Sequence, residues 1–395
     1  MSSWVDKFHE KFAASSINGN DLVPDIAAWK AFLGSLKKSD DPIDIAYNKY
    51  LCRMHLFSKP KRLFMNLLGL GATVVELVYL LRGNRSLQPK RSGVAVLEKS
   101  RAVPNFSDIV PEQIYTDYET VTVSENFNSK FGTLCKEAKA WFFKSVKRHP
   151  FSFFFNYLVY VELAAHSHFL LEYNPEATVV YVNERNVASA IITALYEQSG
   201  RKFISFMHGE YLLQLVQGYM GFSEYYVWDD FYVDMFQNDL NCHIKEYRVY
   251  TPKKLQKKWD FTGIEPEYFC TYYFSGESAQ TVINLAAILS EFEAKGKKCK
   301  VRPHPRNVVH FKEILSNFAG VVIEDSREIP LRDSLAQTEY VVGLTSTVLS
   351  EAVIEGKKIV VDDLSDPAQF ASLSDRRSAV LNREHILLSD LRKSI

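Results

Sequence analysis

Two prolines and two arginines surround a single histidine in the motif Arg302-Pro-His-Pro-Arg306, which directly follows a predicted strand. Proline fixes the backbone φ angle, so the ring of His304 would be held at the end of that strand. Imidazole and guanidinium groups stabilise the negative charge that develops on a departing phosphate. We therefore expect Arg302, His304 and Arg306 to contribute to an anion site.

Hydroxyl residues are concentrated in a second motif, Leu344-Thr-Ser-Thr347, which stands between a predicted strand and a predicted helix. Hydroxyl groups at the start of a helix cap its free N–H groups, and the same N–H groups bind phosphate. Both interpretations stay open, but three hydroxyls, from Thr345, Ser346 and Thr347, favour phosphate. The loop Ser275-Gly276 follows another predicted strand and is either a nucleotide contact or part of a helix cap.

Candidates for a general base lie nearer the middle of the chain, where Phe206-Met-His-Gly-Glu210 follows an apolar strand. A carboxylate or an imidazole at this place could accept the proton of an acceptor hydroxyl. Glu210 is favoured over His208, and Glu184, which follows the preceding strand, is the third candidate. The alternatives are a tight turn whose polar groups cap the next helix and, for Glu184, a structural ion pair.

These motifs need a scaffold of parallel strands, which the pattern of the chain supplies. From residue 93 onward, short apolar runs alternate with helical stretches, as in βαβ units. In open parallel sheets, ligands bind beyond the carboxyl ends of the strands, where all these motifs stand. The predicted strands are 93–97, 178–182, 202–207, 225–228, 269–274, 298–302, 320–323, 340–343 and 358–361, with a further short strand within 112–123.

The sequence thus predicts the α/β class, with two Rossmann-like domains and a helical N-terminal region. The regions are 1–92, helical; 93–262, an acceptor-side domain; and 263–395, a nucleotide-sugar-binding domain that ends in helices. Residues 240–267 are predicted as the crossover between the two domains.

Composition excludes several functions. The chain has 47 basic and 47 acidic residues, and this balance argues against broad nucleic-acid binding. Its five cysteines form no CxxC pair, which indicates reduced thiols in a cytoplasmic protein. No P-loop, GxGxxG, HExxH or GxSxG motif is present. We expect neither a metal nor a cofactor.

An apolar stretch from Leu63 to Leu81, flanked by cations, has three interpretations. A buried core helix is favoured over a membrane-surface helix with a basic rim. A spanning helix ranks last because Asn66 and Glu76 lie within the stretch. Peripheral membrane contact through 59–91 therefore stays open, as does a location at the inner face of the plasma membrane.

The order of His208-Gly, His304-Pro and the Ser/Thr cluster over residues 178–363 resembles bacterial glycosyltransferases of the GT-B fold that use CMP-activated acid sugars. These include the sialyltransferases and Kdo transferases of capsule and lipooligosaccharide (lipopolysaccharide) synthesis. The resemblance implies that His304, Ser346 and Thr347 contact the CMP phosphate. It also implies that Glu351 accepts hydrogen bonds from the ribose, with Glu355 as a solvated last-turn acid.

The family's acid-acid-Gly motif is missing, so His208-Gly-Glu210 and Glu184 stand in for its base. The resemblance implies an inverting, metal-independent transfer of a sialic, legionaminic or pseudaminic acid, or of Kdo, from a CMP-sugar donor. The acceptor would be an oligosaccharide or a lipid-linked glycan. Two alternatives stay open: a CDP-polyol phosphotransferase of teichoic-acid type, and a non-catalytic sugar-nucleotide-binding subunit of a polysaccharide assembly complex. The former usually has Gly-Thr-Pro after its first histidine, whereas Glu210-Tyr211 follows Gly209 here.

Overall fold

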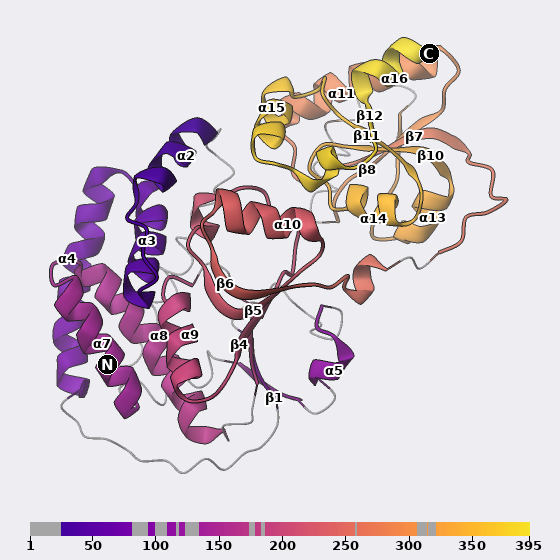
Figure 1. The fold of residues 1–395 in the computed structure, drawn as a ribbon. Helices are drawn as coiled ribbons and strands as arrows, with labels where there is room; N and C mark the ends of the chain where they lie inside the picture. Colours follow the sequence, from indigo (N-terminus) through magenta and orange to yellow (C-terminus); the bar gives the residue numbers. More distant parts are fainter. Residues whose placement is uncertain are drawn as a thin grey trace. The chain divides into compact units, whose positions relative to one another are not determined.

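The computed structural model forms two compact units, each built on a six-stranded parallel sheet (Figure 1). This confirms the predicted α/β class with two Rossmann-like domains. Unit 1 comprises Met1–Gly209 and Leu213–Lys253, and unit 2 comprises Glu210–Leu212 and Lys254–Ile395. The chain passes to unit 2 at Lys254, earlier than the predicted boundary after residue 262. The structure describes residues 25–80, 94–98, 109–115, 118–122, 134–173, 178–182, 186–256, 259–305, 314 and 321–395.

The sheet of unit 1 has the order β2-β1-β3-β4-β5-β6, and every neighbouring pair is parallel. Its strands are β1 (Val94–Glu98), β2 (Tyr118–Thr122), β3 (Val179–Tyr181), β4 (Phe203–Phe206), β5 (Gly221–Val227) and β6 (His243–Val249). Strand β6 falls within 240–267, which the sequence predicts as a crossover, so that prediction is wrong for this stretch. As an edge strand with exposed or half-buried side chains, β6 lacks the apolar run that marks an inner strand.

Helices gather beside this sheet (Figure 1). They are α2 (Ile26–Ser35), α3 (Pro42–His55), α4 (Lys59–Leu80), α7 (Lys136–Arg148), α8 (Phe153–Glu172) and α9 (Ser189–Gln198), with the short α5 (Glu112–Tyr115) and α10 (Asp230–Asp234) elsewhere in the unit. The helical N-terminal region is therefore confirmed for its described residues, 25–80. Helix α3 begins after Asp41, which accepts a hydrogen bond from the N–H of Ile43 at 2.8 Å, and Pro42 occupies its first turn.

Helix α4 corrects the prediction of a buried core helix. One side of it is buried, at Met65 and Gly69, while large apolar side chains on the other side are exposed. Within the described residues, no helix combines the length and the hydropathy needed to cross a membrane.

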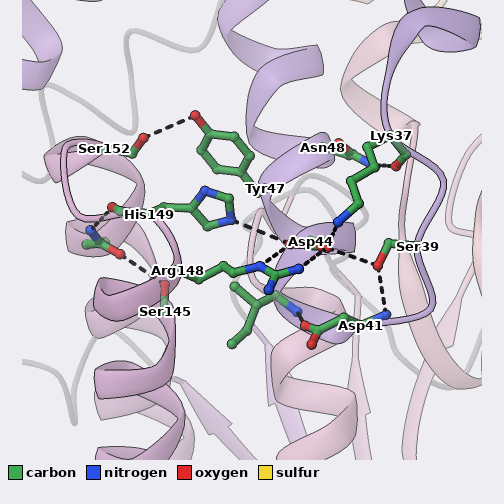
Figure 2. A network of polar contacts seen from close by, with 12 residues as sticks. Lys37, Ser39, Asp41, Asp44, Tyr47, Asn48, Ser145, Arg148, His149 and Ser152 are labelled. Carbon is green, nitrogen blue, oxygen red and sulfur yellow. Dashed lines mark hydrogen bonds and ion pairs between the residues drawn. The ribbon is translucent and has the colours of Figure 1, made fainter.

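A polar network around Asp44 joins α3 to α7 (Figure 2). The guanidinium of Arg148 donates to both carboxylate oxygens of Asp44, at 3.0 and 2.8 Å. Lys37 and Ser39 add hydrogen bonds of 3.0 Å each. The hydrogen bonds from Arg148, and then those from Lys37 and Ser39, outweigh the effect of burial and hold the pKa of Asp44 well below its ordinary value.

We expect Asp44→Asn to destabilise the protein by about 1 kcal/mol at neutral pH, because the cations that it pairs with are half exposed and screened by solvent. The folded-state pKa lies below the unfolded one, near 3.9, so this contribution is complete above that pH and is lost as the pH falls. Urea unfolding at several pH values should therefore show the difference from wild type shrinking below about pH 4. A difference that stays constant down to pH 3 would contradict the assigned ion pair.

The sheet of unit 2 has the order β9-β8-β7-β10-β11-β12, again fully parallel. Its strands are β7 (Tyr268–Tyr273), β8 (Cys299–Arg302), β9 (Val322–Ile323), β10 (Thr338–Gly343), β11 (Lys358–Val361) and β12 (Ile386–Leu387). Numbered within the unit, this is the order 3-2-1-4-5-6 of a dinucleotide-binding Rossmann sheet. Growth of the sheet changes direction between β7 and β10, which makes that place its switch point.

Helices cover both faces of this sheet. They are α11 (Ala279–Ala294), α13 (Leu331–Ala336), α14 (Val348–Ile354), α15 (Pro367–Asp375) and α16 (Leu388–Ser394). Alternate strand residues serve the two faces: Val342 packs in the cluster that includes residues of α11 and α16, and Val341 in the cluster with α13, α14 and α15. Between β8 and β9, where the alternating pattern predicts a helix, residues 306–320 lie outside the described residues except for Ile314.

A buried ion group stabilises the β8 edge of this sheet. The carboxylate of Glu324 pairs with both Lys300 and Arg302, and all three side chains are buried. Lys300 also donates to the amide oxygen of Gln337 at 3.0 Å. Burial by itself would raise the pKa of Glu324, but hydrogen bonds from Lys300, Ser334 and Arg302 outweigh it and lower that pKa. Glu324 is therefore the negative countercharge of two buried cations.

Glu324→Gln should lower the free energy of unfolding by about 3 kcal/mol, because it leaves Lys300 and Arg302 buried without a countercharge. The matched control is Glu339→Gln, which removes an exposed ion pair between neighbouring strands of the same sheet. We expect less than about 1 kcal/mol from the control. Urea denaturation measures both, and equal small effects would show that the buried group is not stabilising.

Candidate active site

Two loops meet at the switch point of unit 2. Strands β7 and β10 are neighbours, so the residues that follow them leave the same edge of the sheet together. The hydroxyl of Ser275, after β7, hydrogen-bonds the hydroxyl of Thr345, after β10. Gly343 permits this approach, since a Cβ there would lie 3.2 Å from the carbonyl oxygen of Tyr273. Two of the predicted site residues are thus in direct contact.

The buried carboxylate of Glu277, which was not among the predicted site residues, holds the loop after β7 in place. Glu277 accepts hydrogen bonds from the N–H groups of Ser275 and Gly276, at 2.8 and 2.9 Å, and from the Ser275 hydroxyl at 3.2 Å. Burial raises the pKa of Glu277, against the opposing effect of these hydrogen bonds. Glu277 thus engages both N–H groups and the hydroxyl of Ser275, and it holds this loop where Ser275 contacts Thr345. Ser278 caps α11, as the alternative interpretation of this loop expected.

The three hydroxyls after β10 have different environments. Ser346 is buried, and its oxygen accepts a long hydrogen bond, 3.4 Å, from the N–H of Val348. Thr345 and Thr347 are exposed, and Thr347 makes no side-chain capping hydrogen bond although it stands at the cap position of α14. Capping therefore accounts for Ser346 alone. Because α14 has only seven residues, its dipole is short, and the hydroxyl groups are the stronger feature.

Helix α14 carries both acids that the sequence analysis singled out. Glu351 lies in its first turn and is half buried. Glu355 corrects the prediction of a solvated acid: it is buried and accepts the N–H of Trp259 at 3.1 Å. Glu351 is thus the more accessible carboxylate of the helix.

The two proposed bases of the 206–210 motif fall in different units. Glu210 belongs to unit 2, where the hydroxyl of Ser350 donates to its carboxylate at 2.9 Å and Leu212 packs against the cluster that contains Leu349. His208 belongs to unit 1 and is half buried. Its position in the sequence predicts Glu210 in the first domain, and its contact with α14 corrects that prediction. The expected helix after this motif is only a three-residue 3₁₀ turn, Leu215–Gln217, without a side-chain cap.

Within the Arg302-Pro-His-Pro motif, Arg302 is buried and His304 is exposed. Arg302 pairs with Glu324 and donates to the carbonyl of Ile329 at 2.8 Å, so its guanidinium stabilises the fold instead of facing the loop edge as predicted. His304 is exposed beyond the carboxyl end of β8, the strand beside β7. Arg306 and Glu184 lie outside the described residues.

Asp362, at the carboxyl end of β11, organises the next loop along the same edge. Its fully buried carboxylate accepts hydrogen bonds from the hydroxyl of Tyr272 at 3.0 Å and from the N–H groups of Leu364 and Ser365. Asp363 accepts the N–H of Ser389 at 2.9 Å. In the part of the chain that the structure describes, no three His, Cys, Asp or Glu side chains are grouped as metal ligands.

No protein-family model matches the chain, and no curated protein is similar enough in sequence to count as a relative. Among solved structures it is similar to the pneumococcal O-GlcNAc transferase GtfA in complex with UDP and GlcNAc, with 11% identity and a TM-score of 0.37. That match covers 59% of this chain and 55% of GtfA, so the chain spans little more than half the length of that protein.

Two further structures overlap it at the same TM-score, 0.37. The UDP-GlcNAc 2-epimerase of Methanocaldococcus jannaschii has 12% identity, over 74% of this chain and 94% of the epimerase. The wall teichoic acid polymerase TagF has 10% identity, over 78% of this chain and 79% of the polymerase. Similarity at this level assigns neither a family nor an activity to the chain.

Proposed function

We propose that the chain is an inverting, metal-independent glycosyltransferase of the GT-B type. It transfers a nonulosonic acid or Kdo from its CMP-sugar to a surface glycan. The observation that supports this most is the contact between the Ser275 and Thr345 hydroxyls at the switch point of unit 2. Ligands of open parallel sheets bind in the crevice at such a point. The hydroxyl-rich loops there suit a nucleotide with one phosphate.

The donor phosphate is bound by neutral hydroxyls and one imidazole. Thr345 and Thr347 are exposed beside the switch point, and His304 is exposed at the adjacent strand end. Arg302 is withdrawn into its pair with Glu324, so His304 becomes the main stabiliser of charge on the departing CMP. Glu351, half buried in the first turn of α14, accepts hydrogen bonds from the ribose hydroxyls.

The acceptor hydroxyl attacks the anomeric carbon of the sugar from the face opposite to CMP, and the configuration is inverted. Glu210 removes the proton of that hydroxyl. Its hydrogen bond from Ser350 supports this role, because a catalytic carboxylate has to be held in one orientation. His208 and Glu184 are the second and third candidates for the base.

CMP should raise the melting temperature of the protein more than UDP or GDP does at the same concentration. A nucleotide at a hundred times its dissociation constant stabilises the folded state by about 2.7 kcal/mol, so the nucleotide that binds most tightly gives the largest shift. Thr345→Val keeps the shape but removes a hydroxyl, and should weaken CMP binding about tenfold. Thr262→Val is the matched control, since Thr262 is exposed and precedes β7, away from the carboxyl ends of the strands. Equal CMP affinity of the two variants would place the nucleotide elsewhere.

His304→Ala should lower turnover with a CMP-sugar about 10²–10³-fold, as the loss of one electrostatic donor to a transition state typically does. The fold should persist because His304 is exposed. His385→Ala, which changes a half-buried histidine just before β12, serves as the control and should retain its rate. Turnover of His304→Ala within about threefold of wild type would exclude His304 from the reaction.

A further inference from the structure

Helix α4 of unit 1 exposes a continuous apolar face. Leu63, Leu67 and Leu70 are spaced i, i+4 and i+7, and they are 64%, 59% and 42% exposed. Phe64, beside them on the same side of the helix, is 57% exposed. Large apolar side chains that gather on one face, instead of being scattered, mark an interaction surface.

The opposite side of α4 is fixed to the protein. Gly69 lies so close to the first turn of α8 that a Cβ there would be 2.4 Å from the backbone nitrogen of Phe154. Asn66 donates to the carbonyl of Phe151 at 3.0 Å and accepts the N–H of Phe154 at 3.2 Å. Asn66 thereby supplies the cap that Ser152 does not provide to α8. The exposed face therefore belongs to a well-anchored helix.

The same contact brings a fifth exposed apolar residue, Phe151, beside α4. Phe151 stands in the turn before α8 and is 81% exposed. Because its carbonyl is bound by Asn66, this turn lies against α4 between the levels of Leu63 and Leu70. We call Leu63, Phe64, Leu67, Leu70 and Phe151 the α4 surface.

Basic residues flank the α4 surface in the sequence. Lys59, Lys61 and Arg62 lie at the start of α4, with no acid in its first turn. Cations there oppose the helix dipole. Arg62 donates to the carbonyl of Phe57 at 2.8 Å and so has a structural role, whereas Lys59 and Lys61 are exposed. The sequence from 59 to 91 holds seven Lys and Arg residues and one acid, Glu76, although basic and acidic residues are equal in number over the whole chain.

We propose that the α4 surface docks on an anionic lipid surface, with its apolar side chains in the interface and the flanking cations on the headgroups. Apolar burial and attraction to anionic headgroups together are what bind such helices to membranes. A second copy of the chain fits less well. A twofold contact through this face would cover the apolar side chains, whereas an anionic surface would also neutralise the flanking cations. The inference does not depend on the proposed function.

The docking is peripheral. Asn66 is bound to α8, and Glu76 would be costly at the centre of a bilayer. The helix therefore lies along the interface, with the side that packs on α8 facing the protein.

Flotation with phosphatidylcholine vesicles, with and without phosphatidylglycerol, tests the proposal on the full chain without substrate. We expect binding to the anionic vesicles to be at least about tenfold tighter than to the neutral ones, and to weaken as salt is raised. The variant Phe64→Ser/Leu67→Ser should bind anionic vesicles at least about tenfold more weakly than wild type. Lys59→Gln/Lys61→Gln should also bind them more weakly, by about fivefold or more.

The matched control is Ile264→Ser/Ile283→Ser, which changes two apolar side chains that are 42% and 41% exposed in unit 2. It should bind vesicles like wild type. Three results would overturn the proposal: no binding to anionic vesicles, equal binding to both vesicle types, or an equal loss in the control. Sedimentation velocity gives a fourth. Self-association that Phe64→Ser/Leu67→Ser abolishes, without vesicle binding, would assign the α4 surface to a second copy.

Discussion

The close approach of β7 and β10 is the constraint on which the site depends. The chain builds β7, β8 and β9 in one direction, and then returns to place β10 on the other side of β7. Gly343, which has no side chain, lies close to the carbonyl of Tyr273 at the ends of the two strands. The loops that follow the strands start side by side and are in contact through Ser275 and Thr345. A Cβ at Gly343 would lie 3.2 Å from the carbonyl oxygen of Tyr273, so the backbone there would have to shift by a few tenths of an ångström.

Buried carboxylates then fix each loop along this edge. Glu277 holds the loop after β7, Asp362 holds the loop after β11, and Glu324 binds the last residue of β8. Each accepts several hydrogen bonds, which is the usual condition for a buried charge. The edge is therefore preorganised, and exposed groups such as His304 and Thr347 stand on a rigid base.

Much of the fold could be predicted from the sequence, because inner parallel strands are continuous apolar runs and helices between them begin at recognisable caps. Strands β4 and β10 lie almost where the apolar runs 202–207 and 340–343 predict them. The pattern failed for β6, whose edge position leaves polar side chains in the strand, and for α4, because a helix that is apolar on two sides does not reveal which side is covered.

The residues of the site were harder to assign than the strands that bear them. Both Ser275 and Thr345 were chosen because they directly follow predicted strands, and the structure places their hydroxyl groups in contact. Position after a strand could not show that Arg302 forms an ion pair with Glu324. The two residues are distant in sequence, and their pairing depends on the order of β8 and β9. Position after a strand also could not show that Glu210 joins unit 2 by contact with Ser350, because a side-chain contact across 140 residues leaves no local signal.

The central claim, that unit 2 binds a CMP-sugar at its switch point, is tested most directly by amide hydrogen exchange with and without CMP. We expect slower exchange in 274–278 and 344–351, the two loops that meet through Ser275 and Thr345, with the strands of unit 1 unchanged. Protection confined to unit 1, or no change in either loop at saturating CMP, would contradict it.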